Sequence, residues 1–257
     1  MAINWDWRPD FGSLTWEFSF DPLHYGVGGD RRREFVTMVQ NELKSFGFVL
    51  NNEVRVQWEL YVDEQERLET PAGADVDNFA KLLNDALKGP SGLLIDDSQI
   101  QRLEVAWISL PGLSGFKLVI ECHQDNVTSK PLRLYEMPDG MWYPMTNLGD
   151  ALDTPQVAMC SALAQRVLTY RRVRHHLRSR GATKAKAYEY SAPIKAIAMG
   201  FHKTRVADSD FVLVGLSEWQ EGQAKMSEAD RRKFVRSKDE IESQAIELAA
   251  ALMPRSR

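Results

Sequence analysis

Two short stretches of the sequence hold the side chains that could do chemistry. Residues 75–81 contain two aspartates and a lysine, and the adjacent pair Asp96 and Asp97 follows about fifteen residues later. Carboxylate oxygens are the ligands that Mg²⁺ prefers, and such an ion can polarise a phosphoryl oxygen and activate a water molecule. A lysine beside it can stabilise charge on the phosphate. These residue types therefore predict a metal-dependent phosphodiester site.

A helix that begins near Asp77 is expected to present the first group. Its apolar stripe has the spacing of a buried helical face and consists of Phe79, Leu82, Leu83, Ala86 and Leu87. Asp75 and Asp77 would point the same way in the extended chain before it, and Lys81 would lie one turn above Asp77. Lys88, Gly89 and Pro90 are expected to end the helix.

A purely structural explanation of the same residues stays open on spacing alone. Aspartate is a favoured N-cap, so Asp75 or Asp77 could satisfy the first backbone amides of the helix. Asp96, Asp97 and Ser98 could form an ordinary turn.

The two stretches together resemble a known family of nucleases. The pattern Asp75-x-Asp77-Asn78-x-x-Lys81, followed by Asp96-Asp97-Ser98-Gln99-Ile100, is similar to that of the RusA-type Holliday-junction resolvases. The resemblance covers about residues 14–122 and implies a small homodimeric, Mg²⁺-dependent endonuclease that acts on branched or double-stranded DNA, with Mn²⁺ as a substitute ion. It also implies roles for single residues: Asp75, Asp77 and Asp97 as metal ligands, Lys81 as the essential lysine, and Asn78 and Asp96 as supporting positions.

The chain departs from the family pattern in two places. The family carries a basic stretch just before the first motif aspartate, whereas residues 66–74 here are nearly devoid of positive charge. The family is also usually one short domain, and this chain adds about 130 residues. The first departure puts binding to a four-way junction in doubt. The second suggests that the added residues could supply the DNA contacts instead.

Hydrophobic periodicity predicts an α/β (α+β) domain over residues 1–125, and the resemblance implies that its sheet is small and mixed and packs against helices. Alternation predicts strands at 14–20 and 54–62, and helical spacing predicts a helix over 31–47. Residues 102–109 and 116–122 are expected to form a β-hairpin. The order of elements matches the family that the motif resembles.

Residues 126–257 are expected to form a basic, mostly helical extension. Residues 123–154 lack periodicity and are interpreted as linker, and helices are expected over 155–178 and from Ser227 to about Met253. The last helix could pair with its copy as a coiled coil or pack on its own domain.

Charge is distributed unevenly along the chain. Residues 1–125 carry 21 Asp and Glu and 11 Lys and Arg, a net charge of −10, whereas residues 126–257 carry 15 and 21, a net charge of +6. The basic candidates for DNA contact in the second half are Arg166, Arg171, Arg172, Arg174, Arg178, Arg180, Lys184 and Lys186. Arginines can supply sequence-independent affinity for phosphates, and a solvated basic face or a contact with the acidic half is the alternative explanation. His175 and His176 are interpreted as surface or phosphate-contacting residues.

Arg31, Arg32 and Arg33 open the first predicted helix, where positive charge opposes the helix dipole. A phosphate or acidic partner would explain them, and so would a loop tip in water.

Composition is that of a globular protein, with 44% hydrophobic and 26% charged residues and two cysteines. The N-terminus lacks the basic region of a signal peptide, and no run of ~18 apolar residues is present. A cytoplasmic location without membrane contact is expected. The chain is predicted to be a structure-selective endonuclease of recombination or repair. The alternatives are a weakly active or inactive nucleic-acid-binding module and a subunit of a larger phage or defence assembly.

Overall fold

The computed structural model describes residues 12–63, 75–109, 114–151, 153–196 and 198–253 of the 257-residue chain. The chain forms two compact units, each described below by itself. The first consists of Met1–Pro131 with Arg205–Phe211, and the second of Leu132–Thr204 with Val212–Arg257. We expected one boundary at 125/126. In the structure the first unit extends to Pro131 and also takes a short segment from the second half of the chain.

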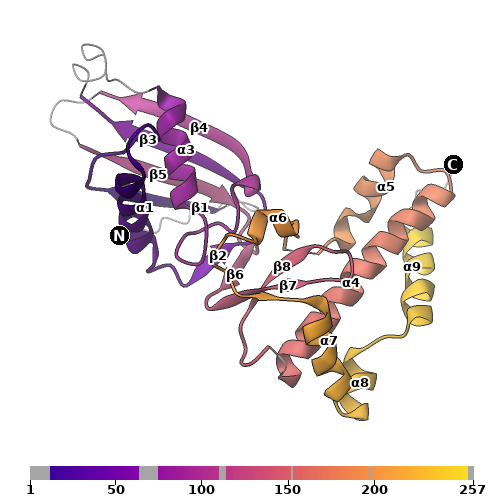
Figure 1. The fold of residues 1–257 in the computed structure, drawn as a ribbon. Coiled ribbons are helices and arrows are strands. Elements are labelled where there is room, and N and C mark those ends of the chain that lie inside the picture. Colours follow the sequence, from indigo (N-terminus) through magenta and orange to yellow (C-terminus); the bar gives the residue numbers. More distant parts are fainter. Residues whose placement is uncertain (1–11, 64–74, 110–113, 152, 197, 254–257) are drawn as a thin grey trace. The chain divides into compact units, whose positions relative to one another are not determined.

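The first unit combines strands with two helices that the structure describes, α1 and α3 (Figure 1). Its elements are β1 (Gly12–Phe18), α1 (Gly29–Leu43), β2 (Phe48–Leu50), β3 (Val54–Tyr61), α3 (Val76–Ala86), the 3-10 turn η1 (Asp97–Gln99), β4 (Ile100–Ile108), β5 (Gly115–Cys122) and β6 (Val127–Ser129). The expected mixed α/β fold class is confirmed. The short strands β2 and β6, which pair with each other antiparallel, were not predicted.

The strand order of the main sheet is β1-β5-β3-β4. Strand β3 pairs antiparallel with β5 and parallel with β4, so the predicted hairpin between β4 and β5 is wrong. The β3–α3–β4 crossover explains the parallel pair, because parallel neighbours need a long connection of this kind. Strand β5 is buried along one face and lies inside the sheet, whereas most side chains of β4 are exposed or half-buried, as suits an edge strand.

Helices α1 and α3 cover one face of this sheet (Figure 1). The even-numbered side chains of β3 and β5 point into the core, as alternation predicted. An aromatic cluster lies at its centre, where the rings of Phe18 and Phe116 stack with centroids 4.4 Å apart. Trp58 is fully buried, and its Nε1 donates to Oδ1 of Asn84 at 3.0 Å, which ties α3 to the sheet. The helix is therefore held both by its apolar stripe and by a polar contact.

The turn after α3 depends on two glycines. Gly89 adopts a φ of +93°, a left-handed conformation that favours glycine at a helix end. A Cβ on Gly92 would lie 2.1 Å from the carbonyl oxygen of Leu87. The predicted end of the helix at residues 88–90 agrees with the structure, because the chain must reverse here without side-chain bulk.

The second unit combines a small sheet with helices. Its elements are β7 (Leu132–Glu136), β8 (Trp142–Thr146), α4 (Thr154–Ser179), α5 (Lys184–Ser191), the 3-10 turn η2 (Ala192–Ile194), β9 (Leu213–Val214), α7 (Leu216–Lys225), α8 (Glu228–Phe234) and α9 (Lys238–Leu252). The chain returns to the first unit within the single-turn helix α6 (Lys203–Val206). The expected helical C-terminal region is confirmed.

The expected linker over 123–154 is wrong, because this stretch contains β6, β7 and β8. The sheet order is β8-β7-β9, and β9 comes from about 70 residues further along the chain. The core beside it contains Tyr135 and Trp219, both almost fully buried. Nε1 of Trp219 donates to the carbonyl of Glu136 at 2.8 Å. These strands depend on distant partners, which explains their weak local pattern.

The long C-terminal helix that we expected is two helices. Val235 leaves the helical conformation, and Ser237 starts α9 with a capping box in which its hydroxyl accepts from the amide of Glu240. Ala245 and Ala249 of α9 are buried in the same cluster as Val173 and Leu177 of α4. Of the two roles considered for this helix, the structure has it packed on its own unit.

Within the described residues, no helix combines the length and the apolar character needed to cross a bilayer.

Replacing Gly92 by alanine is expected to lower the free energy of unfolding by about 1–3 kcal/mol, the cost of forcing atoms into a packed site. The added methyl group would overlap the carbonyl of Leu87. Urea denaturation measures the loss. Gly47→Ala is the control, since a Cβ there meets nothing within 4 Å. Equal stability of the two variants would contradict the prediction.

Candidate active site

Helix α3 presents the first group of motif residues. Phe79, Leu82 and Leu83 are buried, whereas Asp75, Asp77 and Lys81 are exposed. The amphipathic pattern thus orients the polar side chains as expected, with the apolar stripe turned to the core.

Asp75 occupies the N-cap position of α3, but its side chain makes no capping hydrogen bond. Asp77 lies in the first turn, where the helix dipole favours a negative charge. Neither carboxylate has a hydrogen-bond or ion-pair partner among the described residues. Capping therefore does not account for the Asp75 side chain, and both carboxylates are open to a ligand.

Lys81 lies against an aromatic ring that sequence reasoning missed. Its Nζ is 3.8 Å from the ring centroid of Tyr25, and the guanidinium of Arg32 is 4.5 Å from the same centroid. The backbone amide of Tyr25 donates to the carbonyl of Asn78 at 3.0 Å, which places the ring beside α3. Cation–π attraction restricts both cations to this position. Two positive groups therefore lie beside α3, and one of them, Lys81, is one turn after Asp77.

The other two arginines of the run 31–33 lie differently. Arg33 pairs with Asp30 in a fully exposed contact, and Arg31 is exposed. Only Arg32 is drawn toward α3 by the Tyr25 ring.

Asp96 is a structural cap. Its Oδ1 accepts from the amide of Ser98 at 3.1 Å, and its side chain is largely buried. The turn explanation left open above is therefore correct for Asp96.

Gln99 anchors the Asp96–Asp97 segment within the core. The residue is 0% exposed. Its Oε1 accepts from the amides of Ile95 at 2.7 Å and Asp96 at 3.1 Å. Its Nε2 donates to the carbonyls of Leu50 at 2.8 Å and Asn52 at 3.0 Å. The side-chain amide thus makes four hydrogen bonds and joins the segment to the connection between β2 and β3.

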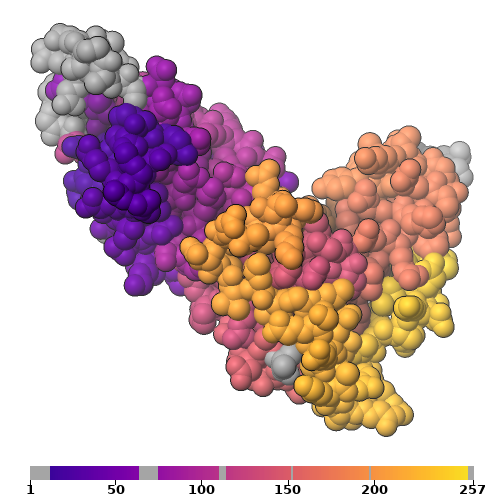
Figure 2. All heavy atoms as spheres, in the orientation of Figure 1, coloured from indigo at the N-terminus to yellow at the C-terminus, as the bar shows by residue number. Residues whose placement is uncertain are grey.

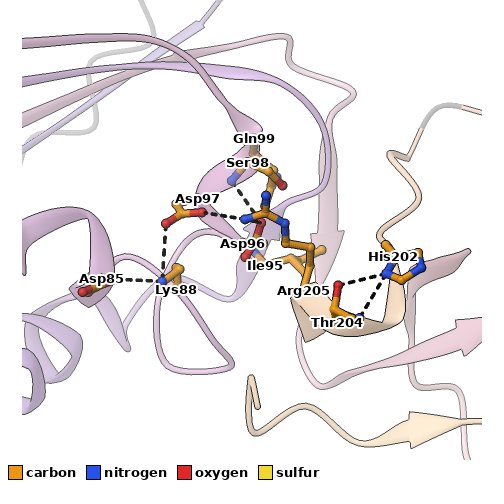
Figure 3. A network of polar contacts seen from close by, with 10 residues as sticks. All are labelled: Asp85, Lys88, Ile95, Asp96, Asp97, Ser98, Gln99, His202, Thr204 and Arg205. Atoms are coloured by element: carbon orange, nitrogen blue, oxygen red, sulfur yellow. Dashed lines mark hydrogen bonds and ion pairs between the residues drawn. The ribbon is translucent and has the colours of Figure 1, made fainter. Parts of the chain in front are cut away.

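Asp97 points toward two cations (Figure 3). Its Oδ2 is 3.5 Å from Nζ of Lys88, which also pairs with Asp85 at 2.7 Å. Its Oδ1 is 3.8 Å from Nη1 of Arg205. The same Nη1 is also 3.8 Å from Oδ1 of Asp96. Burial acts to lower the pKa of Lys88, but the hydrogen bond to Asp85 and the charges of Asp85 and Asp97 outweigh it and raise the pKa. Lys88 is therefore held charged between two carboxylates.

Arg205 was not predicted to belong to this site. It comes from the segment Arg205–Phe211, which packs as part of the first unit. Its side chain is 57% exposed, so its ion pairs are worth no more than about 1 kcal/mol. No local signal separates it from other arginines, because its partners lie more than 100 residues earlier.

The structure places the acids of the motif in two groups. Asp75 and Asp77 lie at the first turn of α3, whereas Asp97 lies beside Lys88, just past its last turn. Eight residues of helix separate Asp77 from Asp85, about 12 Å along the axis. Among the residues that the structure describes, no three His, Cys, Asp or Glu side chains form a group that could hold a metal ion. The described geometry does not bring Asp75, Asp77 and Asp97 together, and Mg²⁺ binding stays a prediction.

The segment 66–74, which is nearly devoid of positive charge, lies outside the described residues.

The basic residues of α4 and α5 divide into two sets. Several are engaged within the second unit: Arg166 donates to the carbonyls of Ile194 and Lys195, and Arg172 and His176 both contact Glu242 of α9. The other set is exposed and makes no such contact among the described residues, and it consists of Arg171, Arg178, Arg180, Lys184 and Lys186. The charge run therefore overstated the number of residues open to DNA, and His176 serves helix packing.

Comparison of the sequence with protein-family models gives no match, and comparison with curated proteins gives none either. Functional assignment therefore rests on the residues themselves.

Gln99→Glu is expected to destabilise the protein by at least about 3 kcal/mol. The introduced carboxylate cannot donate to Leu50 and Asn52, and a buried carbonyl without a donor costs about 1–3 kcal/mol. Thermal or urea unfolding measures the effect. Gln101→Glu makes the same chemical change at an exposed position two residues away and should be nearly neutral. Similar losses in both variants would refute the anchoring role.

Proposed function

We propose that the chain is a Mg²⁺-dependent, structure-selective DNA endonuclease of the RusA type, acting as a homodimer on Holliday junctions or other branched DNA. The observation that carries the proposal is the state of Asp75 and Asp77. Both are exposed carboxylates without a partner among the described residues, and Lys81 and Arg32 lie beside the same helix. Exposed carboxylates without a side-chain partner, on a helix with cations beside it, are the chemistry that a phosphodiester and its metal ion require.

The homodimer follows from the substrate. Branched DNA offers two opposed strands, and a two-fold symmetric pair of sites matches them. The positive net charge of residues 126–257 supports a polyanionic partner, and Arg171, Arg178, Arg180, Lys184 and Lys186 supply exposed cations for it.

A second candidate is a nucleic-acid-binding module with little or no catalysis. The ion pairs of Asp97 favour it, because Lys88 and Arg205 already neutralise the carboxylate. Metal binding at Asp97 requires it to release at least part of these contacts. DNA binding with a steep salt dependence, without cleavage in Mg²⁺ or Mn²⁺, would select this candidate.

Nicking of synthetic four-way junctions in Mg²⁺ tests the first proposal. Asp77→Asn is expected to reduce the rate at least roughly 100-fold, the scale on which loss of one electrostatic group acts. Asp239→Asn is the matched control, since Asp239 is also an exposed aspartate in the first turn of a helix, α9. Absence of nicking by the wild type, or equal nicking by the Asp77 variant, would reject the proposal.

Mn²⁺ affinity tests whether Asp97 takes part. Arg205→Gln is expected to tighten Mn²⁺ binding by up to about fivefold, because an exposed competing ion pair is worth up to ~1 kcal/mol. Asp97→Asn should weaken it. Titration calorimetry measures both changes, with Arg102→Gln as the control, since Arg102 makes a similarly exposed pair with Glu104. Unchanged affinity in both the Arg205 and the Asp97 variants would exclude Asp97 as a ligand.

A further inference from the structure

An exposed tyrosine stands out on helix α5 of the second unit. Tyr188 is 48% exposed, although large aromatic rings are usually buried. The helix packs through small residues, with Ala187 and Ser191 fully buried. Helix α5 lies at the surface of this unit, in the salmon-coloured region of Figure 2. The packing of α5 therefore does not explain why an aromatic ring stands at position 188.

Two cations flank this ring. The guanidinium of Arg174, from α4, is 5.6 Å from the ring centroid, and Nζ of Lys195 is 5.9 Å from it. Arg174 also lies 5.5 Å from the ring of Tyr170, and its Nε is buried without a hydrogen-bond partner. Within the described part of the chain, Arg174 thus contacts two aromatic rings and pairs with no carboxylate.

Two further cations lie on the same two helices. Lys184 lies one turn before Tyr188 on the same side of α5, and Arg178 lies one turn after Arg174 on α4. The sequence has no Asp or Glu from residue 154 to residue 188, and Glu189 points about 100° away from Tyr188 around the helix. The cations that α4, α5 and Lys195 place near the ring therefore favour an anion beside it.

We propose that Tyr188 is a stacking platform for an unpaired DNA base, with Arg174, Lys195 and Lys184 placed for the adjoining phosphates. A half-exposed ring beside cations offers both interactions by which proteins bind single strands. An acidic protein partner would use the cations but would not need the ring. The inference rests on the proposed function in taking DNA as the ligand. It names the substrate class as branched DNA with unpaired nucleotides at the branch.

Binding to the full-length protein in EDTA tests the inference without cleavage. Fluorescence anisotropy would compare a labelled 20-nucleotide oligo-dT with a duplex of the same length over a range of salt concentrations. Tyr188→Ala is expected to weaken single-strand binding about fivefold or more, because stacking contributes about 1–3 kcal/mol per base. The slope of log K against log salt should stay unchanged, and Tyr188→Phe should bind like the wild type.

Lys184→Gln should instead reduce that slope by about 0.7, the value for one phosphate contact on a single strand. Leu148→Ala removes another exposed apolar side chain of the unit and should change nothing. Circular dichroism checks the fold of each variant. Duplex binding as tight as single-strand binding, or unchanged affinity in Tyr188→Ala, would overturn the inference.

The outcome is separable from that of the nuclease proposal. If the protein binds oligo-dT through Tyr188 but cuts no junction, the stacking inference holds and the nuclease proposal is rejected. If the protein nicks junctions and Tyr188→Ala binds oligo-dT normally, the nuclease proposal holds and the stacking inference is rejected.

Discussion

The side-chain amide of Gln99 is the constraint on which the acidic end of the first unit depends. It accepts hydrogen bonds from two backbone amides and donates to two backbone carbonyls within the core. These four hydrogen bonds fix the position of the Asp96–Asp97 segment, because a shift would leave buried polar groups without hydrogen-bond partners. Asp96 caps the 3-10 turn, and Asp97, the first residue of that turn, is thereby held beside Lys88 and Arg205. Part of the nuclease-like motif is therefore structural.

Helix α3 separates the polar chemistry of this unit into two ends. Its first turn carries Asp75 and Asp77 near Lys81, and the turn after it brings Lys88 to Asp97. The helix is rigid because Leu82 and Leu83 are buried and Asn84 bonds to Trp58. The two groups of acids therefore lie at opposite ends of a well-anchored helix.

The second unit shows why a run of basic residues is a weak indicator of a binding surface. Arg166 and Arg172 are engaged by carbonyls and by Glu242, so part of the positive charge stabilises helix packing. Arg174 is held between Tyr170 and Tyr188. Exposure and contacts, rather than sequence charge, separate the cations that remain open to a polyanion.

The sequence by itself determined the elements whose burial pattern is local. The alternation of β3, the stripe of α3 and the helical spacing of α4 each mark the face that turns to the core, and these elements lie within a residue or two of where they were expected. Glycine at 89 marked the end of α3 for a similarly local reason, its left-handed φ.

Only the tertiary structure decided which elements meet. It placed β3 between β4 and β5, made strands of the irregular stretch 127–146, and divided the last helix at Val235. It also brought Arg205 to Asp97 and Tyr25 to Lys81. The physical reason is common to all of these. A local pattern fixes the face that an element must bury, whereas its neighbours, and the charges they carry with them, follow from how all the apolar faces cover one another at once.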